Sequence, residues 1–237
     1  IGIRKMREGR FAEAVEIFES LPAEVWKQEY VYYPSVEESF PLKEYLEFAG
    51  STAHNLFDPP PTHFKLYNKL TFAREAAELL KAAQSTPEHA DVFYMRLGNL
   101  FYHTPYWGYN EYLWDGQFVT TARFLGTYFP LSGKGAETML QQKLNDYLKD
   151  YGSRNLAERF FRTAAEVSKN PETVAKALIL AHECSQTALT SLHTDWGRLD
   201  TLTPYLARLT REFSHTEVYK KLPYTCPDLA KFLKVST

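Results

Sequence analysis

The sequence predicts an all-α protein, on three observations. Apolar residues recur at intervals of three and four along most of the chain, as they do on one face of a helix. No segment shows the clean alternation of polar and apolar residues, rich in β-branched side chains, that is typical of strands. Glycines and prolines fall between the periodic segments, where helices end. We therefore expect one elongated domain over residues 1–237, an irregular right-handed stack of antiparallel helix pairs.

The first predicted helix lies within residues 11–21 and ends before Pro22, which cannot continue it. Its apolar stripe consists of Phe11, Ala14, Val15, Phe18 and Leu21. An irregular connection is expected next, followed by a helix over 42–49 that Gly50 closes. Three successive prolines then make residues 58–63 a stiff loop.

Helical periodicity returns over residues 64–84, where one face carries Leu66, Leu70, Ala73, Ala77 and Leu80. Ser85 or Thr86 is the expected N-cap of the following helix, with Pro87 at its favoured first position. The remaining predicted helices span 116–129, 135–151, 153–168, 171–192, 198–213, 215–221 and 227–234.

Two segments, REGRFAEAVEIFESL and KDYGSRNLAERFFRTAAE, share one spacing. In each, an alanine follows a glycine by five residues, a phenylalanine follows four later, and a small or apolar residue three after that. These residues are Gly9, Ala14, Phe18 and Leu21 in the first segment, and Gly152, Ala157, Phe161 and Ala164 in the second. The glycine would end one helix, the alanine would admit a second helix closely, and the ring would fill the groove between them.

This pattern resembles the tetratricopeptide repeat, a helix–turn–helix unit that stacks into a solenoid. The first-helix signature of the family also appears as Leu97, Gly98 and Phe101, and more weakly as Leu144 and Leu148. Asn170-Pro171 stands two residues after the position of the family's closing proline. About half the chain aligns, and Pro105 stands where the second unit should have its turn glycine.

The first unit lacks most of its first helix, and the chain starts at Ile1 inside a helical pattern. We therefore expect a fragment of a longer protein. Similar repeats, rich in tyrosine and phenylalanine, occur in large uncharacterised bacterial proteins. That resemblance implies a binding scaffold and favours the cell envelope, periplasmic or lipoprotein-anchored, over the cytoplasm.

The most unusual stretch is FYHTPYWGYNEYLW, residues 101–114, which is half aromatic. Helical spacing places Phe101, Tyr102 and Trp114 in the core. The remaining aromatic residues, which sit in or beside a predicted loop, are the candidate ligand- or partner-binding residues: Tyr106, Trp107, Tyr109 and Tyr112. A second aromatic group either packs against this loop or lines the same groove: Tyr30, Tyr32, Tyr33 and Phe40.

The sequence gives little reason to expect catalysis, a metal or a cofactor. It contains none of the common phosphate-loop, dinucleotide, nucleophile-elbow or zinc-protease motifs. His182, Glu183 and Cys184 are adjacent on a predicted helix, so their side chains point in different directions and cannot share one metal. Cys184 and Cys226 are expected to be free thiols.

Charge and hydropathy limit the classes of partner that we expect this chain to bind. A net charge of −2 provides no electrostatic basis for binding nucleic acid or an anionic membrane. No run of eighteen apolar residues exists, so no membrane span is predicted. We expect a non-catalytic scaffold that binds a protein or peptide. The alternatives are a carbohydrate-binding module that uses residues 101–114 and, third, an enzyme whose acid pair the fold assembles. Carboxylates such as Glu37 and Glu38, or Asp146 and Asp150, sit in surface-like contexts in the sequence.

Overall fold

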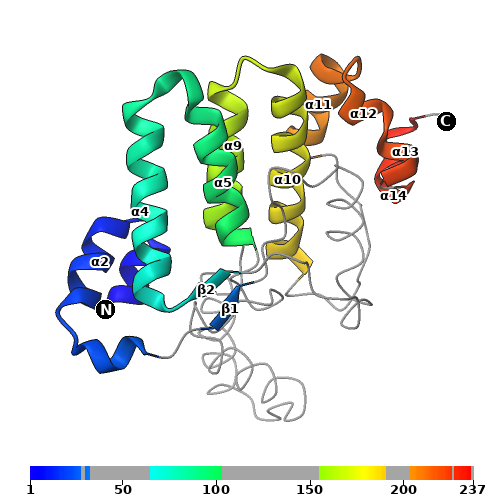
Figure 1. The fold of residues 1–237 in the computed structure, drawn as a ribbon. Helices are drawn as coiled ribbons and strands as arrows, with labels where there is room; N and C mark the ends of the chain where they lie inside the picture. The colour runs from blue at the N-terminus through cyan, green and yellow to red at the C-terminus, as the bar shows by residue number, and fades with distance from the viewer. Residues whose placement is uncertain (28–29, 33–64, 103–154, 191–202, 226, 236–237) are drawn as a thin grey trace, which may run out of the picture.

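The computed structural model of the chain describes residues 1–27, 30–32, 65–102, 155–190, 203–225 and 227–235 (Figure 1). These residues are mostly helical, which confirms the predicted all-helical class. They also contain two three-residue strands that the sequence did not predict, β1 (Tyr30–Tyr32) and β2 (Lys65–Tyr67). The predicted helices over 42–49, 116–129 and 135–151 lie outside the described residues, as does Cys226.

The main helices form a row in which each packs against the next along the chain (Figure 1). In order, they are α1 (Gly2–Arg7), α2 (Phe11–Glu19), α4 (Lys69–Ser85), α5 (Ala90–Tyr102), α9 (Asn155–Val167), α10 (Pro171–Thr190) and α11 (Pro204–Phe213). Three short helices follow: α12 (Glu217–Lys220), α13 (Leu222–Thr225) and α14 (Pro227–Leu233). One cluster of buried apolar side chains runs through the row from Met6 to Ala230.

The turn between α1 and α2 depends on Gly9, whose φ of 75° lies in the left-handed region that favours glycine. Its N–H donates to the Met6 carbonyl at 2.9 Å, and the Arg10 N–H donates to the Lys5 carbonyl at 2.9 Å. These bonds satisfy the last carbonyls of α1 and reverse the chain. The predicted role of Gly9 as a helix-ending glycine is confirmed.

The stripe predicted on the second helix is buried at Phe11, Ala14 and Phe18. Its last member, Leu21, was predicted wrongly, because its side chain is 43% exposed. The reason is that α2 ends at Glu19, so the helical spacing no longer holds two residues later. A short 3-10 helix, η1 (Ala23–Trp26), follows Pro22.

The helix predicted over 64–84 begins later than expected, because residues 65–67 form β2. Asn68 is the N-cap of α4: its side chain accepts from the Thr71 N–H at 2.9 Å, while the Thr71 hydroxyl accepts from the Asn68 N–H at 3.0 Å. This reciprocal pair is a capping box and sets where the helix starts. Leu66 therefore lies on a strand instead of the predicted helical face.

The next helix starts as the sequence predicts, with one addition. Thr86 occupies the N-cap position and Pro87 the first position of a 3-10 turn, η2 (Pro87–His89), which leads directly into α5. Ser85, the other predicted N-cap, is instead the last residue of α4.

Helices α9 and α10 lie within two residues of their predicted bounds. The helix predicted over 198–213 begins only at Pro204, because Thr203 has an extended backbone and acts as its N-cap. The Thr203 hydroxyl accepts from the Leu206 N–H at 3.4 Å, which satisfies one of the unpaired donors at the start of α11. Thr216 caps α12 in the same way.

Candidate functional site

The helices of the row lie side by side, so the row has two ends along the helix axes, and these two ends differ. At one end, α4 joins α5 and α9 joins α10 through short turns (Figure 1). At the other end lie the C-terminus of α5, the N-terminus of α9 and the β1–β2 pair (Figure 1). We call this the insertion end, defined by Tyr32, Lys65, Tyr102 and Asn155, because residues 33–64 and 103–154 join the described elements there.

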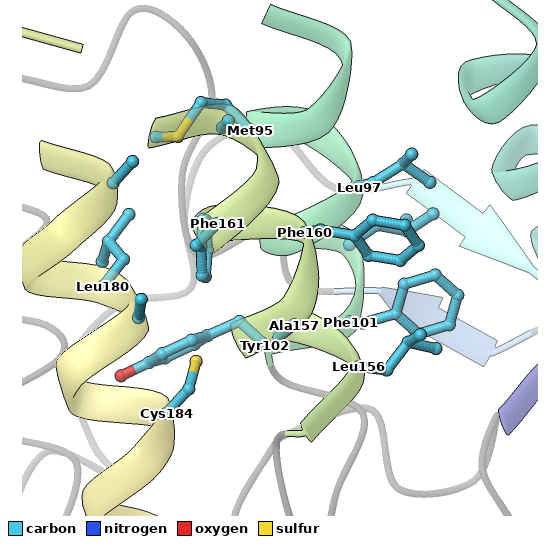
Figure 2. Packing of buried hydrophobic residues seen from close by; sticks show 14 of the residues in the cluster. Met95, Leu97, Phe101, Tyr102, Leu156, Ala157, Phe160, Phe161, Leu180 and Cys184 are labelled. Atoms are coloured by element: carbon cyan, nitrogen blue, oxygen red, sulfur yellow. The ribbon is translucent and has the colours of Figure 1, made fainter. Parts of the chain in front are cut away.

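Phe101 anchors the start of the aromatic stretch in the core. Its ring stacks on Phe11 with centroids 5.2 Å apart and 9° between planes. It meets Phe72 edge-on at 5.3 Å and Phe160 at 6.0 Å. These rings come from four different helices, so the end of α5 is held from several sides. Figure 2 shows Phe101 beside Phe160 of α9.

Tyr102 is buried on the other side of α5. Its side chain is 0% exposed and its ring meets Phe161 edge-on, with centroids 6.3 Å apart. Figure 2 shows the ring extending toward Cys184 on α10. The prediction that Phe101 and Tyr102 belong to the core is therefore confirmed.

The four predicted binding residues, Tyr106, Trp107, Tyr109 and Tyr112, lie outside the described residues, and so does Trp114. Of the second aromatic group, Tyr30 and Tyr32 lie on β1, while Tyr33 and Phe40 are outside the described part. The structure does describe the elements that flank both stretches in the sequence, and we call these elements the frame. In this frame Tyr102 is the last described residue before residues 103–154.

The elements that flank residues 33–64 are the strands β1 and β2, which pair with each other. β1 and β2 are antiparallel, with Tyr30 opposite Tyr67 and Tyr32 opposite Lys65. Directly after β2, the Asn68 side chain donates to the Trp26 carbonyl at 2.9 Å. The Trp26 indole in turn donates to the Phe18 carbonyl at 3.1 Å.

The pairing of α5 with α9 was not predicted. The sequence assigned Gly98 and Phe161 to different repeat units, yet their helices pack together and Gly98 lies directly against the Phe161 ring. Ala157, on the same face of α9, is 0% exposed. The burial of Ala157 agrees with its predicted place between helices, whereas the contact of Gly98 with Phe161 was not predicted.

His182 is the residue whose environment sequence reasoning missed. Its side chain is 0% exposed, and its Nδ1 lies 3.0 Å from the Thr203 hydroxyl. Burial alone lowers the pKa of the imidazole to about 4, so the ring is neutral at pH 7. The Thr203-Pro204 pair was a readable signal, since threonine followed by proline marks a helix start.

Carboxylates in the described part of the chain also join helices. Glu172 on α10 accepts from the backbone N–H groups of Glu217 and Val218 at 2.8 and 3.0 Å. Asp91 accepts from the Ser168 hydroxyl at 2.5 Å, which ties the start of α5 to the end of α9. The carboxylates that the sequence places in surface-like contexts lie outside the described residues: Glu37, Glu38, Asp146 and Asp150.

Within the described residues, no group of three or more histidine, cysteine, aspartate and glutamate side chains is placed to hold a metal ion. Among the described helices, none has the length and apolar character needed to cross a membrane.

No family model matches this sequence, and neither a curated protein nor a solved structure matches the chain.

Proposed function

We propose that this chain is a non-catalytic helical scaffold that binds a protein or peptide at its insertion end. The observation that carries the proposal is the difference between the two ends of the row. Short turns close one end, while the described residues that flank 33–64 and 103–154 in the sequence lie at the other. In repeat proteins, insertions gather on one face, and that face is often the binding face.

The rigidity of the frame supports this proposal. The aromatic stretch follows directly after Phe101 and Tyr102, whose side chains are 1% and 0% exposed. Binding residues on connecting segments work best when a rigid scaffold positions them, because less entropy is lost on binding. The stacked rings of Phe11 and Phe101 provide that rigidity at the point where the stretch begins.

The aromatic residues of the stretch supply the chemistry. Tyrosine and tryptophan dominate the binding energy of many protein interfaces, because each buries a large apolar area and retains one polar group. Tyr106, Trp107, Tyr109 and Tyr112 are therefore the proposed contacts. The titratable groups of the described helices have a different role, since His182 and Glu172 both join neighbouring helices.

The experiment starts from a phage-displayed random peptide library selected on the immobilised chain. A selected peptide carrying a fluorophore is then titrated by fluorescence anisotropy. The double substitution Trp107→Ala, Tyr109→Ala is expected to weaken binding by about tenfold or more, with the circular dichroism spectrum unchanged. Tyr224→Ala is the matched control, because Tyr224 is an exposed aromatic residue on α13 and should leave the affinity unchanged.

Two results would contradict the proposal. One is a library that yields no binding peptide, and the other is a double variant that binds as tightly as the parent chain. Soluble oligosaccharides provide the second arm of the experiment. Quenching of tryptophan emission by a glycan, lost in Trp107→Ala, would assign the stretch to carbohydrate binding instead.

A further inference from the structure

Two glycine–phenylalanine contacts repeat along the row. Gly2 on α1 lies against the ring of Phe18 on α2, so closely that a Cβ atom on this glycine would overlap the ring. Gly98 on α5 lies against the ring of Phe161 on α9 in the same way. Each contact joins two consecutive helices of the described row, and each needs a residue without a side chain.

The residues around the two contacts have the same spacing along the second helix of each pair. Ala14 precedes Phe18 by four residues and Ala157 precedes Phe161 by four, and both alanines are 0% exposed. Gly9 lies five residues before the first alanine, and Gly152 lies five before the second. The α1–α2 pair and the α5–α9 pair therefore share one packing arrangement.

The two pairs differ in the length of chain between their helices. Gly9 follows Gly2 by seven residues, whereas Gly152 follows Gly98 by fifty-four. The second spacing is longer by 47 residues, and the 47 residues directly before Gly152 are 105–151. Removing that range would place Gly152 seven residues after Gly98, in the position that Gly9 holds after Gly2.

We infer that residues 105–151 are an insertion into a helical hairpin, and that the α5–α9 pair does not need them in order to form. The contacts between the two helices support this, because they come from described residues on both sides of the insertion, such as Phe101 with Phe160. The turn needed for a direct connection exists in the same molecule, at Gly9 with its φ of 75°.

A consequence follows for binding, and it rests on the proposed function. All four proposed contact residues, Tyr106, Trp107, Tyr109 and Tyr112, fall within 105–151. The scaffold and the peptide-binding element are then separable parts of one chain. Long insertions at such a position are tolerated because the entropy lost on closing a loop grows only with the logarithm of its length.

The test is the deletion of residues 105–151, which joins Thr104 to Gly152. We expect a helical circular dichroism spectrum, cooperative unfolding, and an unfolding temperature within about 10 °C of the full chain. The matched control is the same deletion carrying Gly152→Val. It should unfold at a much lower temperature, because a β-branched residue is strained in the left-handed region that the new turn requires.

A second variant replaces residues 105–151 with a flexible glycine–serine linker. If the linker variant folds and the direct connection does not, the equivalence of Gly152 with Gly9 is overturned. If neither variant folds, the inference that the α5–α9 pair forms without residues 105–151 is overturned.

The peptide selected on the full chain separates this inference from the proposed function. Loss of binding to that peptide in the folded deletion variant supports both. A folded deletion variant that binds the peptide as well as the full chain would keep the insertion and overturn the assignment of binding to it.

Discussion

His182 of α10 and Thr203, the N-cap of α11, lie with the imidazole Nδ1 3.0 Å from the threonine hydroxyl. The hydroxyl oxygen accepts from the Leu206 N–H, so its own proton can be donated to Nδ1. Burial keeps the imidazole neutral at pH 7, and in the tautomer with its proton on Nε2 the Nδ1 atom accepts from this hydroxyl. The contact therefore joins the start of α11 to α10.

The first prediction concerns pH. Burial lowers the pKa of His182 from 6.5 to about 4, so the unfolded chain binds a proton in this range and the folded chain does not. The free energy of unfolding should fall as the pH decreases from about 6.5 to about 4, by roughly 3 kcal/mol from this group. Urea unfolding at a series of pH values measures the effect.

His182→Gln is the control for that measurement, because glutamine has a similar size and does not titrate. The variant should lose less stability than the parent chain between pH 6.5 and pH 4. Equal losses in the two chains would show that other groups cause the pH dependence.

The second prediction concerns Glu172. Its carboxylate accepts two backbone hydrogen bonds at the start of α12, and glutamine would retain one acceptor while placing an amide N–H against the other donor. We expect Glu172→Gln to lower the free energy of unfolding by about 1 to 2 kcal/mol. Glu217→Gln is the matched control, expected to change it by less than about 0.5 kcal/mol, since that side chain is exposed and pairs only with Lys220 among the described residues.

The third prediction concerns Tyr205 on α11. Its hydroxyl donates to Glu158 on α9 at 2.6 Å, and burial together with this carboxylate raises the pKa of the tyrosine to about 12. Tyr205→Phe should lower the free energy of unfolding by about 1 kcal/mol. In the parent chain, a pH titration of tyrosinate absorbance should show one group ionising near pH 12 that is absent from the variant.

The fourth prediction concerns Gly98. In an exposed helix, Gly→Ala stabilises by up to about 1 kcal/mol, but here the methyl group would overlap the Phe161 ring. We expect Gly98→Ala to destabilise the chain by about 1 to 3 kcal/mol. Adding Phe161→Leu should recover part of that loss, and strictly additive effects in this double-mutant cycle would argue against direct contact.

Much of the helical framework could be predicted from the sequence, because its signals are local. The stripe of Phe11, Ala14 and Phe18 and the turn glycine Gly9 each act within a few residues. Proline and threonine also mark helix starts, as Pro87 does before α5. Those features depend on backbone sterics and on apolar spacing, which a single sequence records directly.

The long-range pairings could not be predicted. Strands β1 and β2 have three residues each, too few to show alternation, and residues 33–64 separate them. The α5–α9 pair was assigned to two repeat units because spacing arguments assume that paired helices follow one another closely. The contact of His182 with Thr203 joins two helices, and the spacing of apolar residues does not indicate it either.

The candidate binding site remains a prediction from the sequence. Tyr106, Trp107, Tyr109 and Tyr112 lie outside the described residues, so their surroundings are not part of the present structure. The sequence did place Phe101 and Tyr102 in the core correctly, because helical spacing continues through the end of α5.

The unequal ends of the row also set the order in which the chain can assemble. Helices α4 and α5, and likewise α9 and α10, face each other across short turns, so each of these pairs can form early by contacts close in sequence. Joining the two pairs means bringing α5 to α9 across residues 103–154, and only then do Phe101 and Phe160 meet. We therefore expect the contact between Phe101 and Phe160 to form after the two helix pairs, when these pairs dock.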